Sequence, residues 1–92
     1  MQDASYQKLL DLLCRTNDKE KISALLDALL TDKEKKELIN RLKIFSLLEQ
    51  GVTQREISST LGVGIATVSR GAKAFQQYRM IDLLADMKNT PK

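Results

Sequence analysis

The stretch TQREISSTLGVGIATVSRGAKAFQQY, residues 53–78, constrains the fold of this chain more than any other. Thr53 and Glu56 have the T-x-x-E spacing of a capping box, which predicts that a helix begins there. Gly62 predicts where that helix ends, because glycine readily adopts the left-handed conformation that stops a helix.

A turn at residues 62–64 would join this helix to a second one, which runs from about Ile65. Val68 on the second helix would then pack back against Ile57 and Leu61 on the first. Two short helices locked by a glycine turn are typical of a helix-turn-helix, here at about residues 53–78.

An ordinary helical hairpin in an all-α core is the alternative interpretation. Against it, the second helix carries Ala66, Thr67 and Ser69 where a core helix would carry leucine. Within residues 51–79 the acidic side chains are limited to Glu56. The basic side chains there are Arg55, Arg70, Lys73 and Arg79. We therefore favour DNA binding, although short motifs of this kind also occur by chance.

The charge distribution points the same way. Residues 1–50 carry nine basic and nine acidic side chains, whereas residues 51–92 carry six basic and three acidic ones. The net charge of +3 therefore comes from the part of the chain that contains the helix-turn-helix. A basic excess on a DNA-reading unit is the expected electrostatic footprint, and a merely solvated basic surface is the alternative.

Composition limits the other functions that the chain could have. With 92 residues, 4% aromatic content and one proline, we expect a single all-α domain, residues 1–92. No histidine and one cysteine exclude the usual zinc sites and histidine-based catalysis, so we expect no enzyme, metal or cofactor. Cys14, in a leucine-rich helix, is expected in the core. Without a membrane-length apolar run or a signal-peptide pattern, we expect a cytoplasmic protein and no membrane partner.

Helical periodicity along the chain predicts about six short helices. The third begins at a second T-x-x-E box, Thr31 to Glu34, and is apolar on more than one side. The expected helices are residues 5–15, 18–30, 31–50, 53–61, 65–78 and 80–88. The apolar stripes of the first three exceed what one small bundle needs, so we favour a homodimer over a single folded-back core.

Two segments carry a resemblance to a known family. They are LLTDKEKKELINRLKIFSLLEQG, which contains Arg41, and TQREISSTLGVGIATVSRG, whose G-I-A-T-x-x-R-G portion is the most specific match. Over about residues 25–75 the chain resembles the tryptophan repressor family. The resemblance implies an intertwined, all-helical homodimer that represses transcription at a double-stranded DNA operator, with L-tryptophan as corepressor.

The resemblance also implies a ligand site. Arg41 and Arg70 would flank the indole ring and pair with the carboxylate, as guanidinium groups do well. The remaining site residues would be Ala28, Leu30, Thr31, Thr67, Gly71 and Ala74, with the backbone carbonyls near Ala28 and Leu30 receiving the ammonium group. The family often has serine at the position of Ala74, which here provides no hydroxyl. From the residues alone, an ion pair with Glu37 would explain Arg41 and a phosphate contact would explain Arg70.

On the DNA side, the resemblance implies that Gln54 and Arg55 contact phosphates, and that the recognition helix faces the groove. The full expected set is Gln54, Arg55, Ser58, Gly64, Ile65, Ala66, Thr67, Ser69 and Lys73. Ser58 stands where the family often has lysine, which removes one phosphate contact. Few of these side chains can bind a base edge through two hydrogen bonds. We therefore expect readout through DNA shape and water, of which this family is itself a known example.

Two other functions remain open at this stage. The first is a related DNA-binding regulator with a different ligand or none. The second is a helical interaction module whose helical hairpin contacts protein instead of DNA. Salt dependence would separate DNA binding from the second alternative, because binding to phosphates weakens steeply with salt.

Overall fold

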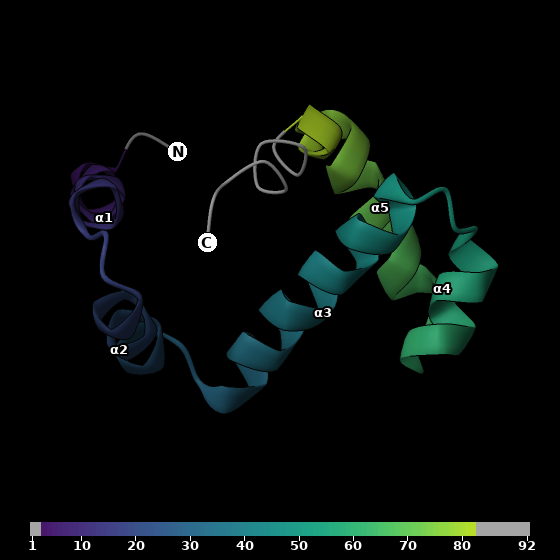
Figure 1. Cartoon of the computed structure of the whole chain (residues 1–92), viewed down its shortest axis with the longest axis horizontal. Helices are drawn as coiled ribbons and strands as arrows, with labels where there is room; N and C mark the ends of the chain where they lie inside the picture. Colours follow the sequence, from purple (N-terminus) through teal and green to yellow (C-terminus); the bar gives the residue numbers. More distant parts are fainter. Residues whose placement is uncertain (1–2, 83–92) are drawn as a thin grey trace. The chain divides into compact units, whose positions relative to one another are not determined.

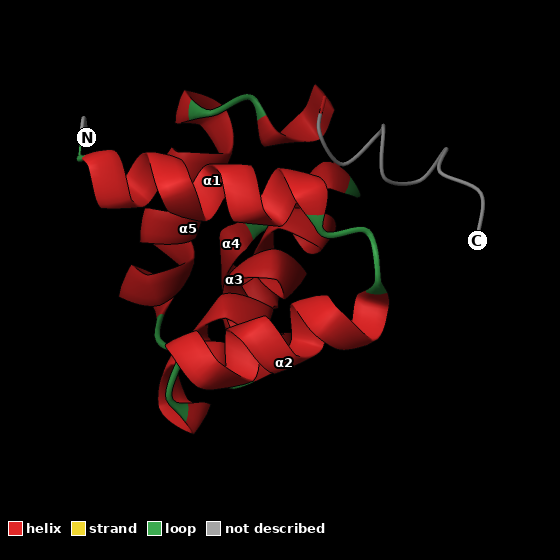
Figure 2. Ribbon diagram, turned by 90° about the vertical axis from the view of Figure 1, so that its left-hand side faces the viewer, coloured by secondary structure: helices red, strands yellow, loops and turns green. Residues whose placement is uncertain are grey.

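The computed structural model describes residues 3–82, and every regular element within them is a helix (Figure 2). The helices are α1 (Ala4–Arg15), α2 (Lys19–Leu29), α3 (Asp32–Glu49), α4 (Gln54–Leu61) and α5 (Ile65–Gln77), labelled in Figure 1. This confirms the all-α prediction. Residues 80–82 are also helical, and the rest of the last expected helix lies outside the described residues. No helix in residues 3–82 is long and apolar enough to cross a membrane.

Helices α1 to α4 begin within one residue of where the sequence predicted, and side chains cap free N–H groups at their starts. The Asp18 carboxylate accepts a hydrogen bond from the Glu20 N–H at 2.9 Å. At the start of α3, the Thr31 N–H donates to Glu34 at 2.8 Å, and the Glu34 N–H donates to the Thr31 hydroxyl at 3.1 Å. Hydrogen bonding of the Glu34 carboxylate to the backbone N–H of Thr31, and to a lesser extent to the Thr31 side chain, lowers the pKa of Glu34 below its ordinary value.

The chain divides into two compact units, residues 1–36 and residues 37–92, which we call the N-terminal and C-terminal units. Neither α1 nor α2 of the N-terminal unit has a buried residue. Its exposed large apolar side chains are Tyr6, Leu10, Leu12, Leu13 and Leu29. Cys14 is exposed as well, so its expected place in the core is wrong for the single chain. Two short helices alone offer no second layer against which to bury these side chains.

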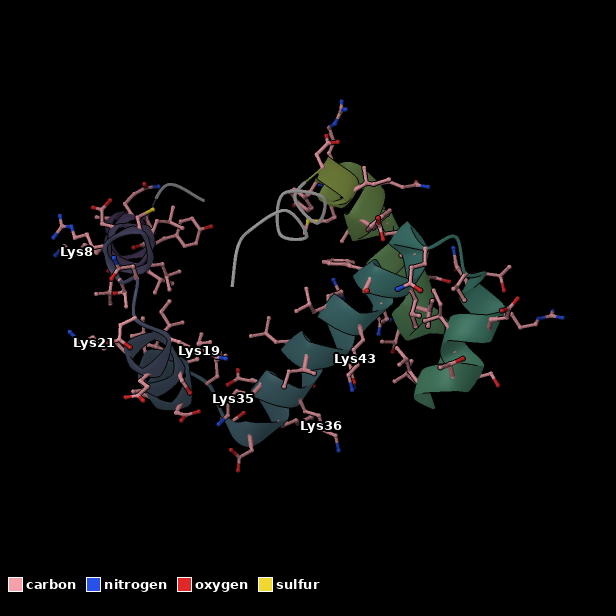
Figure 3. All side chains as sticks on the ribbon, viewed as in Figure 1. Lys8, Lys19, Lys21, Lys35, Lys36 and Lys43 are labelled. Carbon is pink, nitrogen blue, oxygen red and sulfur yellow. The ribbon has the colours of Figure 1, made fainter. Side chains whose placement is uncertain are left out.

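A lysine holds the connection between α2 and α3 within the N-terminal unit. The Lys35 ammonium lies 2.7 Å from the Asp27 carboxylate and 3.4 Å from that of Asp32 (Figure 3). The hydrogen bond to Asp27 is the main reason why the pKa of Lys35 is raised. Together with the Thr31–Glu34 box, this ion pair fixes the local course of the chain between the two helices.

The C-terminal unit contains a small core. Ile44 from α3, Ile57 from α4 and Val68 from α5 have no exposed surface, which confirms that Val68 packs against Ile57. The partly buried side chains around them are Leu47, Leu48, Val52, Leu61 and Val63. Three fully buried side chains contribute roughly 1.5–3 kcal/mol each, so this core alone gives limited stability.

The middle helix α3 is apolar on two sides, as the sequence indicated, but only one side is covered. Ile44 faces the core of the C-terminal unit, whereas Leu38, Ile39 and Leu42 are 52%, 54% and 46% exposed. The periodicity showed two apolar faces. It could not show which of them packs against α4 and α5.

Candidate DNA interface and ligand site

The turn between α4 and α5 is held by Ser58 and by a left-handed glycine. Gly62 has a φ of 68°, as the sequence predicted for the end of α4. The backbone carbonyl of Ser58 accepts the N–H groups of Gly62 and Val63, at 3.0 and 3.2 Å. The Ser58 hydroxyl donates to the Val63 carbonyl at 2.6 Å. Ser58, predicted at the DNA interface, therefore also braces the turn.

Helix α5 begins without a side-chain cap. Its N-cap residue, Gly64, has extended geometry (φ −66°, ψ 150°) and no side chain that could satisfy the first N–H groups. The following residues Ile65 and Ala66 are exposed, Ile65 by 52%. An open helix N-terminus combines free N–H donors with the positive end of the helix dipole, so it suits a phosphate.

The residues predicted to contact DNA lie on α4, the turn and α5, and most of them are exposed. Seven are exposed, namely Gln54, Arg55, Gly64, Ile65, Ala66, Ser69 and Lys73, and Ser58 and Thr67 are half-buried. Within the described residues, no acidic side chain forms an ion pair with Arg55, Arg70 or Lys73. Their charges are therefore available to an external anion. Their individual roles stay predictions.

One side-chain hydrogen bond crosses between the two helices of the motif. The Ser69 hydroxyl on α5 donates to the Gln54 side-chain carbonyl on α4, at 2.9 Å. Both residues were predicted at the DNA interface, but no pattern in the sequence indicated that they contact each other.

On another side of α5, Gly71 lies in close contact with α3. It is buried, and a Cβ added to it would stand 2.9 Å from Cγ2 of Ile44 and 3.5 Å from Cδ of Arg41. The absence of a side chain at Gly71 therefore lets the two helices approach. The family resemblance implied that Gly71 belongs to the ligand site. In this structure Ile44 and the stem of Arg41 lie against Gly71.

The predicted ligand residues of the C-terminal unit thus lie near one another. Thr67, Gly71 and Ala74 recur at helical spacing on α5, and Arg41 contacts this stripe at Gly71. Arg70 stands beside the stripe, and its guanidinium lies 3.4 Å from the Thr67 hydroxyl. The ion pair with Glu37 that would otherwise explain Arg41 does not occur in the described residues.

The other predicted ligand residues belong to the N-terminal unit. Ala28 and Leu30 lie at the C-terminal end of α2, and neither carbonyl accepts a hydrogen bond from a described residue. Free carbonyls at this negative end of a helix dipole suit an ammonium group. Thr31 accepts the Glu34 N–H through its hydroxyl. These roles also stay predictions.

Residues 3–82 contain no cluster of side chains that could hold a metal ion. Three contacts were not predicted from the sequence. They are the contact of Ile44 with Gly71, the hydrogen bonds of Ser58 in the turn, and the hydrogen bond between Gln54 and Ser69. Only the second had a local signal, a hydroxyl one turn before a helix-ending glycine.

Comparison with known proteins identifies the family. Residues 4–86 match the family described as Trp repressor protein. A Trp operon repressor homolog of Xylella fastidiosa (strain M23) is 33% identical over 90% of this chain and 91% of its own length. One from Vibrio atlanticus is 38% identical over 87% and 89%, and one from Vibrio cholerae is 41% identical over 75% and 68%. With its helical fold and its helix-turn-helix, the chain belongs to the Trp repressor family of transcription regulators.

Proposed function

We propose that this protein is a sequence-specific DNA-binding repressor whose affinity for its operator is raised by L-tryptophan. The observation that carries the proposal is that α5 has one side exposed for DNA and another side packed against α3. One side of this helix, with Ile65, Ala66 and Ser69, is exposed, while the side with Gly71 lies against α3. A ligand bound between α3 and α5 would therefore act directly on the helix that reads DNA.

The chemistry of the stripe at Gly71 agrees with an amino acid that has an aromatic side chain. Arg41 and Arg70 are free of ion pairs with described residues, so their guanidinium groups can pair with a carboxylate and stack on a ring. Because Ile44 and Arg41 occupy the space at Gly71, ligand entry requires the Arg41 side chain to move. Coupling of this kind between two sites typically amounts to ~1–3 kcal/mol.

The repressor would act as a homodimer. The N-terminal unit buries no residue of its own helices, and Leu38, Ile39 and Leu42 of α3 are also exposed. A second copy of the chain would cover such faces, and two-fold symmetry would place two recognition helices in successive major grooves about 34 Å apart.

The direct test is calorimetric titration of the protein with L-tryptophan, with and without a DNA duplex selected by the protein from a random library. We expect binding in both cases and tighter binding with DNA, since coupling is reciprocal. The duplex affinity itself should fall steeply with salt.

A repressor with another ligand or none is the second candidate, and Ala74 favours it because a methyl group there offers no hydrogen bond to an amino acid. If the protein bound DNA but showed no heat with millimolar L-tryptophan, this second candidate would replace the first. If the protein bound no duplex at all, the remaining candidate function would be that of a helical interaction module.

A further inference from the structure

We propose that Gln54 and Ser69 act as a pair in reading DNA, in which Gln54 sets the hydrogen-bonding character that Ser69 presents to a base. This inference rests on the proposed DNA-binding function and adds a specificity determinant to it. The two residues stand fifteen positions apart in the sequence, on different helices, and are joined by a 2.9 Å hydrogen bond on an exposed surface.

The hydrogen bond uses the only proton of the Ser69 hydroxyl. A serine hydroxyl has one donor and two acceptor lone pairs, so Ser69 keeps only acceptor capacity once it donates to Gln54. In the major groove, adenine N6 and cytosine N4 are donors, whereas guanine offers only the acceptors N7 and O6. Ser69 should therefore favour adenine or cytosine, or a water that donates to it, and should disfavour guanine.

The same bond orients the amide of Gln54. Its oxygen is directed to Ser69, which leaves the two N–H groups of the amide as its free hydrogen-bonding groups. Gln54 is the first residue of α4, directly after the cap residue Thr53, so these donors stand at the positive end of a helix. A phosphate oxygen accepts such donors, whereas a free amide could equally present its oxygen and repel the phosphate.

No other described residue forms a hydrogen bond with the side chain of Gln54 or Ser69, and both side chains are exposed. Removal of the bond should consequently change DNA binding more than it changes folding. The pair can thus be tested without disturbing the core around Ile57 and Val68.

The experiment begins with selection of preferred sites from a random duplex library by the wild-type protein in millimolar L-tryptophan. The affinity for the selected duplex, and for duplexes carrying each single base-pair change, is then measured for Ser69→Ala, Gln54→Met and the double variant. Ser69→Thr, which retains the hydroxyl, serves as the rescue variant. Ser59→Ala is the matched control, because Ser59 is an exposed hydroxyl on α4 without a partner among the described residues.

We expect Ser69→Ala to weaken binding to the selected duplex about three- to tenfold in the wild-type background. When Ser69→Ala is added to Gln54→Met, it should weaken binding by less than about twofold. Ser69→Ala should remove the base preference at one base pair of the site. At that base pair, Gln54→Met should raise the relative affinity for guanine, because the Ser69 hydroxyl no longer donates to Gln54 and can donate to the guanine acceptors instead. Ser69→Thr and Ser59→Ala should bind as the wild type does.

Three results would overturn the inference while leaving the proposed function intact. The first is that the effects of the two substitutions on affinity are additive. The second is that both substitutions weaken binding to all sequences uniformly, with no change in base preference. The third is that both variants lose thermal stability equally and keep the wild-type base preference, which would assign the bond to folding alone. If the wild-type protein selected no sequence at all, the proposed function would fail and the inference with it.

Discussion

Replacement of Gly71 by alanine tests the close approach of α3 and α5. The new Cβ would stand 2.9 Å from Cγ2 of Ile44, a distance that Cβ atoms do not tolerate, and Ile44 has no exposed surface into which to move. Overpacking of this kind costs ~1–3 kcal/mol. Alanine returns about 0.5–1 kcal/mol because it is the better helix former. We therefore expect a net destabilisation of up to ~2.5 kcal/mol.

The assay is urea denaturation followed by circular dichroism, at one fixed protein concentration because assembly would shift the apparent stability. Ile44→Leu provides the matched background, since leucine keeps the volume of isoleucine but lacks the methyl group on Cβ that would clash. In that background Gly71→Ala should cost clearly less, or stabilise. If Gly71→Ala stabilised the wild-type protein by ~1 kcal/mol, Gly71 would behave as an ordinary solvent-facing glycine and the argument would be refuted.

The remaining predictions concern assembly, DNA, ligand and pH. Sedimentation at micromolar concentration should show a dimer, and a lone 10.4 kDa species would contradict this. Arg55→Ala should weaken binding to all duplexes alike and reduce the salt slope by about one unit, whereas a changed sequence preference would disprove a phosphate contact. Arg41→Ala should abolish the response to L-tryptophan in a DNA-binding titration. Weak ligand-independent binding to DNA should remain, because Arg41 lies outside α4 and α5. A retained response would show that Arg41 does not belong to the ligand site. The lowered pKa of Glu34 means that the hydrogen bonds of its carboxylate with Thr31 stabilise the fold above pH 4.5, and that this stabilisation is lost as the pH falls through the lowered pKa. Urea midpoints of Glu34→Gln should therefore vary less with pH below 4.5 than those of the wild type, and parallel curves would contradict this.

Helix boundaries could be predicted from the sequence because their causes are local. A capping side chain lies within three residues of the N–H that it satisfies, as at Thr31 and Thr53, and a left-handed glycine such as Gly62 ends the helix that precedes it. The packing of Val68 on Ile57 could be predicted for a related reason, since a short turn brings the two helices together.

Contacts between distant positions could not be predicted in this way. The choice of Ile44 as the buried residue of α3 depends on which of two apolar faces meets α5. The bond between Gln54 and Ser69 depends on the relative position of two helices, and either side chain alone is an ordinary polar surface residue. The ligand residues came from the family resemblance, since their residue types alone favoured an ion pair for Arg41 and a phosphate contact for Arg70.

If the chain assembles with a second copy, the absence of any buried residue in α1 and α2 would make its lifetime in the cell depend on its abundance. Isolated helices of 12 and 11 residues are marginally stable in water, so in an unassembled chain they would open often and expose their backbone to proteases. A partner that covers them would slow cleavage by mass action. Newly made chains that fail to find a partner would accordingly be degraded faster than assembled ones, and the turnover of the protein would slow as its copy number rises.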